Sequence, residues 1–364
     1  VALAGESMLL QVGGRRSVRL STQQQQGAEL AASEVRAGRE SVQVSGRQLL
    51  VGGRPFHIKG VNWNPVTLGQ RSPKGLDFRG FVDRDSLLMQ QAGINVVRTY
   101  EPLTDRSVLD TLWNRGIRLA NTAYAHGADD PSVVGGVVDA VKDHPAILMW
   151  VLGNEWNYNK LYKKSLGFND ALARIRQASD IVRQHDSSHP IVTVYGGLPP
   201  PHVVRDLPNI DVWGINAYNG LSFGPIFDSW VGLSHKPLFL GEYGADAYDS
   251  IRRSVNEEAQ AVATTKLTDE ILAHSSVLHP DGVCVGGFLF EFADEWWKDR
   301  RGDDSQHDVG GVAPGGGPHP DMTFNEEFWG IVHEDRRPRP AYHAYAATAL
   351  PTSAAFAQSG HIAH

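Results

Sequence analysis

Short apolar runs recur along the chain from residue 56 onward, and longer amphipathic segments separate them. Runs of about four to eight residues that are rich in Val and Ile are typical of strands buried on both faces of a parallel sheet. The apolar runs predict strands at Phe56–Asn62, Ile94–Tyr100, Ile117–Tyr124, Ile147–Leu152, Ile191–Tyr195, Asp211–Tyr218, Pro237–Glu242 and Cys284–Phe290. Apolar residues at helical spacing predict helices between them, most clearly over Arg79–Ala92 and Asn169–His185.

Eight strand–helix units over about 300 residues predict an α/β protein of the (β/α)8 barrel type. The alternative is a doubly wound open sheet, which would usually place a glycine-rich phosphate turn after its first strand. The first strand here is followed by Asn62-Trp63-Asn64-Pro65, which cannot form that turn. The pattern therefore favours the closed barrel.

The domain division follows from where this pattern begins and ends. Residues 1–40 have little pattern and are predicted to be an N-terminal arm or tail, and residues 351–364 a C-terminal tail. Residues 41–350 form the predicted barrel. A β-hairpin is predicted at its start, with strands at Val42–Val44 and Leu49–Val51.

Composition and charge narrow the possible partners. The 364 residues are 41% hydrophobic and 21% charged, which excludes a largely disordered chain. The net charge of −7 argues against nucleic acid or an anionic membrane surface as the main partner. No apolar run reaches the roughly 18 residues of a membrane span. Oligomeric state and location stay open. The start at Val1 lacks the layout of a signal peptide, as a mature chain also would, and a mature form would favour an extracytoplasmic location.

The sequence gives little indication of a metal site or a cofactor site. Cys284, the single cysteine, excludes an intramolecular disulfide and a multi-thiolate zinc site, and we expect it to be buried and inert. No HExxH pair is present, so no metal and no cofactor are predicted. The acidic run Asp303–Asp308 is interpreted as a solvated loop rather than a cation site, and Gly310–Pro318 as a long loop at the barrel mouth.

Two glutamates at strand ends are the main candidates for chemistry. Active sites of such barrels lie at the carboxyl ends of the strands. Glu155 follows the fourth predicted strand and Glu242 ends the seventh, and these two strands face each other across the barrel mouth. Two facing carboxyl groups, one protonated and one ionised, are what cleavage of a glycosidic bond requires. The alternative is that each is an ordinary solvated loop residue.

Several blocks of the chain resemble retaining β-glycosidases of clan A, and most closely the barrel domain of glycoside hydrolase family two. Asp143–Glu155 resembles the acid/base motif, and Lys236–Ala245 resembles the nucleophile strand. Gly330-Ile331 with Arg336–Tyr342 resembles the closing segment of the domain. The resemblance spans roughly residues 41–350 and includes the β-galactosidases, β-glucuronidases and β-mannosidases.

The resemblance implies roles for the matching residues. Glu155 would be the general acid/base and Glu242 the nucleophile. Asn154 would bind the sugar 2-hydroxyl, Arg98 would keep Glu242 ionised from beneath, and Tyr218 would donate a hydrogen bond to Glu242.

The substrate does not follow directly from the resemblance. Full-length family members usually carry β-sandwich domains before the barrel, whereas only an arm and a hairpin precede it in this sequence. The aromatic mouth and the block Phe290–Lys298 also resemble β-1,3-glucan transglycosylases. A β-linked oligo- or polysaccharide, and among these a β-glucan, is therefore the predicted substrate. The alternatives are an exo-acting β-galactosidase, β-glucuronidase or β-mannosidase, or a non-catalytic carbohydrate-binding barrel.

Polar and aromatic residues at the strand ends are predicted to bind this carbohydrate, since aromatic faces pack on pyranose rings and polar edges bind hydroxyl groups. The predicted substrate-binding residues are Asn62, Trp63, Tyr100, Tyr124, His126, Trp156, Glu291, Glu295, Trp296 and Trp297. The alternative for the tryptophans is that they pack in the core, and the alternative for the glutamates is that they form salt bridges.

Overall fold

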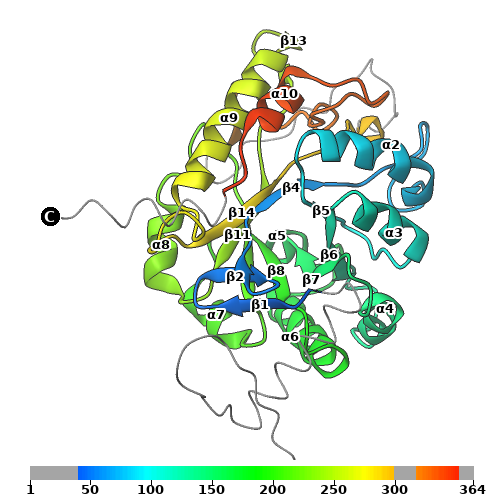
Figure 1. Ribbon diagram of the computed structural model, residues 1–364, viewed down its shortest axis with the longest axis vertical. Helices are drawn as coiled ribbons and strands as arrows, with labels where there is room; N and C mark the ends of the chain where they lie inside the picture. Colours follow the sequence, from blue (N-terminus) through cyan, green and yellow to red (C-terminus); the bar gives the residue numbers. More distant parts are fainter. Residues whose placement is uncertain (1–39, 299–316, 352–364) are drawn as a thin grey trace, which may run out of the picture.

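The computed structural model describes residues 40–298 and 317–351. Within them, eight parallel strands close into a barrel, with each strand paired to the next one along the chain and the last paired to the first (Figure 1). The barrel strands are β4 (Ile58–Asn62), β5 (Val96–Arg98), β6 (Arg118–Tyr124), β7 (Ile147–Asn154), β8 (Ile191–Gly196), β9 (Val212–Asn216), β11 (Leu238–Tyr243) and β14 (Cys284–Leu289). The predicted (β/α)8 fold is confirmed.

Each predicted strand coincides with one of these eight, with ends that differ by a few residues. The agreement has a simple cause, because these strands are buried. All residues of β4, β5 and β6 and the first seven residues of β7 are buried. Side chains that point inward pack in the barrel interior, and those that point outward pack against the helices. Strands of this kind appear in the sequence as continuous apolar runs.

Helices surround the barrel and cover its outer face (Figure 1). They are α2 (Phe78–Gln91), α3 (Arg106–Asn114), α4 (Val133–Val141), α5 (Trp156–Asn159), α6 (Phe168–His185), α7 (Pro201–Asp206), α8 (Ile226–Leu233), α9 (Glu257–Ala273) and α10 (Pro340–Ala347). The two helices predicted from periodicity correspond to α2 and α6. Asp77 caps α2 by accepting a hydrogen bond from the Gly80 N–H at 2.8 Å, which satisfies a backbone donor that the helix leaves unpaired.

A small antiparallel sheet precedes the barrel. It comprises β1 (Val42–Ser45), β2 (Gln48–Val51) and β3 (Arg54–Pro55), so the predicted hairpin has a third, short strand. Val42, Leu49 and Val51 belong to the same buried cluster as side chains of the barrel interior. The sheet therefore extends the barrel core, and we infer that it covers one end of the barrel.

Short strand pairs lie near the barrel mouth: β10 (Asn219–Gly220) with β15 (Gly317–Pro318), and β12 (Tyr248–Asp249) with β13 (Ser254–Val255). The single-turn η1 (Trp296–Lys298) follows the last barrel strand. The predicted arm except Glu40, the C-terminal tail beyond Pro351, the acidic run and most of the predicted Gly/Pro loop lie outside the described residues. No helix of the described part is long and apolar enough to cross a membrane.

Candidate active site

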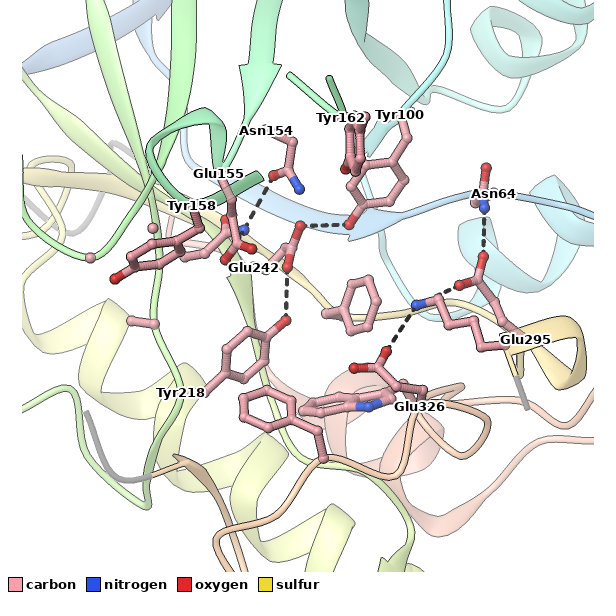
Figure 2. Close-up of a pocket in the computed structure, with 18 of the residues that line it drawn as sticks. Asn64, Tyr100, Asn154, Glu155, Tyr158, Tyr162, Tyr218, Glu242, Glu295 and Glu326 are labelled. Carbon is pink, nitrogen blue, oxygen red and sulfur yellow. Dashed lines mark hydrogen bonds and ion pairs between the residues drawn. The ribbon is translucent and has the colours of Figure 1, made fainter. Parts of the chain in front are cut away.

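A cavity of about 890 Å³ opens among the loops that follow the barrel strands (Figure 2). Its volume lies within the range typical of sites for small ligands. Both sequence-predicted carboxylates line it, together with Tyr100, Asn154 and Tyr218. These five residues come from four of the eight barrel strands, β5, β7, β9 and β11, or from the segments directly after them.

Glu155 is aimed by an unusual backbone geometry. Side chains normally alternate between the two faces of a strand, yet both Asn154 and Glu155 line the cavity. The pairing of β7 with β8 shifts between Leu152 and Asn154, which makes Gly153 an extra residue. Glu155 itself has a left-handed backbone, with φ of +46°, and non-glycine residues held in that region concentrate at functional sites. The bulge and the left-handed turn together direct two neighbouring side chains into one cavity.

Glu242 lies near the end of β11 and has a donor at each carboxylate oxygen. The Tyr100 hydroxyl donates to Oε1 at 2.8 Å, and the Tyr218 hydroxyl donates to Oε2 at 3.0 Å. Arg98 Nη1 lies 3.4 Å from Oε1. Burial, followed by the charge of Glu242, raises the pKa of both tyrosines well above its ordinary value, so both remain donors. Glu242 thus has two hydroxyl donors and one guanidinium group directed at its carboxylate.

A buried hydrogen-bond chain joins the two glutamates. Arg98 Nη2 donates to Asn154 Oδ1 at 2.7 Å. Asn216 Nδ2 donates both to the same oxygen at 3.2 Å and to Glu155 Oε1 at 3.1 Å. The Arg98 side chain is fully buried and lies beneath the cavity rather than in its wall. The chain therefore fixes Asn154 with its amide NH₂ as the remaining donor.

The surroundings of Glu155 favour its neutral form. Burial, and next the negative charge of Glu242, raise its pKa to about 7. One amide hydrogen bond, from Asn216, acts in the opposite direction but does not offset these two effects. At neutral pH one carboxyl group of the pair thus has an environment suited to holding a proton, and the other an environment suited to a charge.

Four of the ten predicted substrate-binding residues line the cavity: Tyr100, His126, Glu295 and Trp297. His126 Nε2 lies 2.6 Å from Glu101 Oε1. The hydrogen bond with Glu101 raises the pKa of His126 despite its partial burial. This histidine therefore forms an ion pair with a carboxylate of the cavity wall when it is protonated.

Three predicted aromatic contacts are wrong, because the side chains point into the layer between barrel and helices. Trp63 Nε1 donates to Asp85 at 2.9 Å, and Trp156 Nε1 donates to Thr193 Oγ1 at 2.9 Å. The Tyr124 hydroxyl donates to a backbone carbonyl at 3.1 Å. All three side chains are buried and none lines the cavity. Strand alternation accounts for Trp63, since the preceding Asn62 points inward.

Three other predicted substrate-binding residues also lie outside the cavity wall. Asn62 is buried beneath it, where its Oδ1 accepts from Arg98 at 3.1 Å. Trp296 packs edge-on against Phe328 with ring centroids 4.9 Å apart. Glu291 is buried behind the wall, and burial followed by the charge of Glu295 raises its pKa well above the usual range. The prediction that these residues contact substrate is therefore corrected.

Sequence reasoning did not select several residues that line the cavity, among them Asn216, Tyr162 and Glu326. Asn216 ends β9 and could have been found from its place at a strand end. Tyr162 follows Glu155 in the chain and is about half exposed. Glu326 lies in a segment with no periodic pattern, so no sequence signal marked it.

The barrel is similar in sequence and in fold to known glycosidases. Residues 121–264 match the family described as "Glycosyl hydrolases family 2, TIM barrel domain". The resemblance to family 2 is confirmed. The β-glucuronidase of Canis lupus familiaris is 27% identical over 258 residues, which cover 63% of this chain and 37% of that protein. A β-galactosidase of Aeromonas hydrophila is 23% identical over 349 residues, or 87% of this chain and 29% of that protein.

Solved structures of family 2 enzymes share the fold. A β-D-glucuronidase from Dictyoglomus thermophilum superimposes with a TM-score of 0.60 at 19% identity, covering 86% of this chain and 54% of that chain. The chain thus spans less than half the length of the two curated relatives and about half of the solved one.

No group of three or more His, Cys, Asp and Glu side chains in residues 40–298 and 317–351 is arranged to hold a metal ion.

Proposed function

We propose that this chain is the catalytic barrel of a retaining β-glycoside hydrolase in which Glu242 is the nucleophile and Glu155 the general acid/base. The observation that supports this most strongly is the contrast between two carboxyl groups in one cavity. Glu242 accepts hydrogen bonds from two tyrosines and lies beside Arg98, whereas the pKa of Glu155 is raised to about 7. Pairs of titratable groups with opposite environments mark acid and nucleophile assignments.

In the first step a Glu242 oxygen attacks the anomeric carbon as the glycosidic C–O bond breaks. Glu155 gives its proton to the departing oxygen, so the leaving group departs as a neutral alcohol. In the second step Glu155 removes a proton from water, the resulting hydroxide attacks the anomeric carbon, and Glu242 is released as a carboxylate. Two inversions retain the β configuration. A sugar hydroxyl in place of water would give transfer by the same route.

Arg98, Asn154 and Tyr218 support this chemistry in the proposal. Arg98 and Tyr218 stabilise the carboxylate form of Glu242 before attack and after its release. Asn154 has its carbonyl oxygen occupied by Arg98 and Asn216, so its NH₂ group can donate to a sugar hydroxyl. A donor to the 2-hydroxyl that tightens in the transition state would contribute to rate.

The substrate in this proposal is a β-linked hexopyranosyl unit at a chain end. The named relatives are β-glucuronidases and a β-galactosidase, which supports the exo-acting alternative over the β-glucan preference expected from the aromatic mouth. Three of the aromatic residues on which that expectation rested are buried away from the cavity. A non-catalytic barrel would bind sugars without turnover and would need no acid with a raised pKa.

The test is to incubate the protein with a panel of 4-nitrophenyl β-glycosides and to follow the reaction by ¹H NMR. The proposal requires release of nitrophenol with the β-anomer of the sugar appearing first, ahead of mutarotation. An α-anomer as first product would exclude the retaining mechanism. Binding without turnover across the panel would favour the non-catalytic alternative.

The pH dependence of the reaction should report Glu155. Because the acid must be protonated when the glycosidic bond breaks, we expect kcat/KM to fall as pH rises through about 7. In Glu155→Gln this alkaline limb should disappear, along with most activity on substrates with poor leaving groups. A limb that persists unchanged in the variant would assign the titration to another group.

Removal of the Tyr218 hydroxyl should weaken catalysis without preventing folding. Tyr218→Phe deletes one donor to the Glu242 carboxylate, and a hydrogen bond to a charged group contributes about 1.5–3 kcal/mol. We expect kcat/KM to fall about 10- to 100-fold. Tyr342→Phe is the matched control, because its hydroxyl donates to the Leu88 carbonyl away from the cavity. Equal activity in Tyr218→Phe and the parent would contradict the assigned role.

A further inference from the structure

Carboxylates outnumber cations in the described wall of the cavity. Five glutamates line it, at positions 101, 155, 242, 295 and 326. Among the described residues, the basic side chains in the wall are His126 and Lys298. Arg98 adds one cation beneath the floor. The cavity therefore presents a surplus of negative charge to any ligand that enters it.

Each of these cations is already paired within the protein. Lys298 Nζ lies 2.7 Å from Glu295 Oε2 and 3.3 Å from Glu326 Oε2. Burial alone would lower the pKa of Lys298, but the charges of Glu295, Glu291 and Glu326 raise it well above the ordinary value. His126 pairs with Glu101, and Arg98 with Glu242. No cation of the described wall is left to compensate a further anion.

Lys298, Glu295 and Glu326 form a group that we call the Lys298 cluster. It lies on the side of the cavity that the sugar would occupy, rather than on the side of the leaving group. Figure 2 shows Glu295 and Glu326 on the right of the cavity and Glu155 on the left, with Glu242 between them. If Glu155 protonates the leaving group, that group departs on the Glu155 side. The ring substituents of the glycosyl unit then extend towards the Lys298 cluster, where two carboxylates surround one ammonium group.

We infer that the glycosyl unit accepted by this cavity is an uncharged hexopyranose and that the cavity discriminates against uronic acids. The inference rests on the proposed function and deepens it, because it separates this chain from the uronidases among its relatives. A sugar carboxylate placed near Glu295 and Glu326 would meet like charge, and such juxtaposition weakens binding. A hexopyranose hydroxymethyl group can donate to either carboxylate instead.

The experiment measures kcat/KM for matched pairs of 4-nitrophenyl glycosides, β-glucoside with β-glucuronide and β-galactoside with β-galacturonide. We expect the neutral member to exceed the uronide by about 100-fold or more in every pair of which a member is cleaved. A parent protein that cleaves a uronide within tenfold of its neutral partner, or faster, overturns this inference and leaves the proposed function intact. Failure to cleave any member of the wider panel of 4-nitrophenyl β-glycosides, with aglycones this reactive, overturns the proposed function itself.

A variant tests whether the Lys298 cluster is the source of the discrimination. Glu326→Gln removes one of the two carboxylates that hold Lys298, from a side chain about a third exposed. The ratio of uronide to neutral kcat/KM should rise about tenfold or more. Glu258→Gln, an exposed change of equal charge on α9 outside the cavity wall, should leave that ratio at the parent value. An unchanged ratio in Glu326→Gln contradicts the role given to this cluster.

Discussion

Glu242→Gln is expected to lower kcat/KM by about 10⁴-fold or more on every substrate that the parent cleaves. The amide keeps the shape of the carboxylate, and its remaining oxygen can still accept from one of the two tyrosines, Tyr100 or Tyr218, but it cannot form the glycosyl ester. The loss should be the same for good and poor leaving groups, since both must pass through attack by this residue. Initial rates over a series of aryl β-glycosides measure it.

This variant needs a control that shows it is folded. Glu242 is buried beside Arg98, so the variant should be compared with the parent by circular dichroism and thermal unfolding before activity is interpreted. Glu258→Gln provides a matched surface change. A folded Glu242→Gln protein that retains near-parent activity would show that another group attacks the anomeric carbon.

Glu155→Ala should produce a loss that depends on the leaving group. General acid catalysis contributes about 10²- to 10⁴-fold, and a leaving group of low pKa needs little of it. We expect a loss in this range for alkyl glycosides and a loss below about tenfold in the first step for dinitrophenyl glycosides. Steady-state rates combined with pre-steady-state bursts separate the two steps.

The same variant lacks the base for the second step, so a small anion that needs no deprotonation should restore turnover. Azide added to Glu155→Ala should yield a β-glycosyl azide, because the incoming nucleophile takes the position of the activated water. Losses of equal size for alkyl and dinitrophenyl glycosides would argue that Glu155 is a structural residue rather than the acid.

The barrel was predictable from the sequence because its strands are buried on both faces. Continuous apolar runs such as Ile147–Leu152 and Cys284–Phe290 leave few other structures for the chain. Spacing between runs then predicted the closed topology. The two glutamates were predictable for the same reason, since the rule that chemistry lies at strand ends requires only the strand boundaries.

Side-chain direction at the strand ends was not predictable. Trp156 directly follows Glu155, and only the Gly153 bulge and the left-handed turn at Glu155 decide which of the two enters the cavity. Trp63 similarly points towards Asp85 on α2, where its indole N–H is satisfied. An aromatic residue next to a strand end has no sequence signal that distinguishes a sugar platform from a helix contact.

The charge balance of the cavity was also beyond sequence reasoning. Lys298 and Glu326 are 28 residues apart, and the ion pair between them depends on the path of the chain after the last barrel strand. That segment has neither helical nor strand periodicity. Ion pairs between such loops arise from tertiary structure alone.

The most direct test of the account is covalent labelling with a 2-deoxy-2-fluoro-β-glycosyl fluoride of a sugar that the parent cleaves. The electron-withdrawing fluorine at C2 slows breakdown of the glycosyl-enzyme, while the good leaving group lets it form. Peptide mass spectrometry should then locate one fluorosugar on Glu242 and none in the Glu242→Gln variant. A label on Glu155 or any other residue, or turnover of the fluoride with no covalent species, would contradict the assignment of Glu242 as the nucleophile.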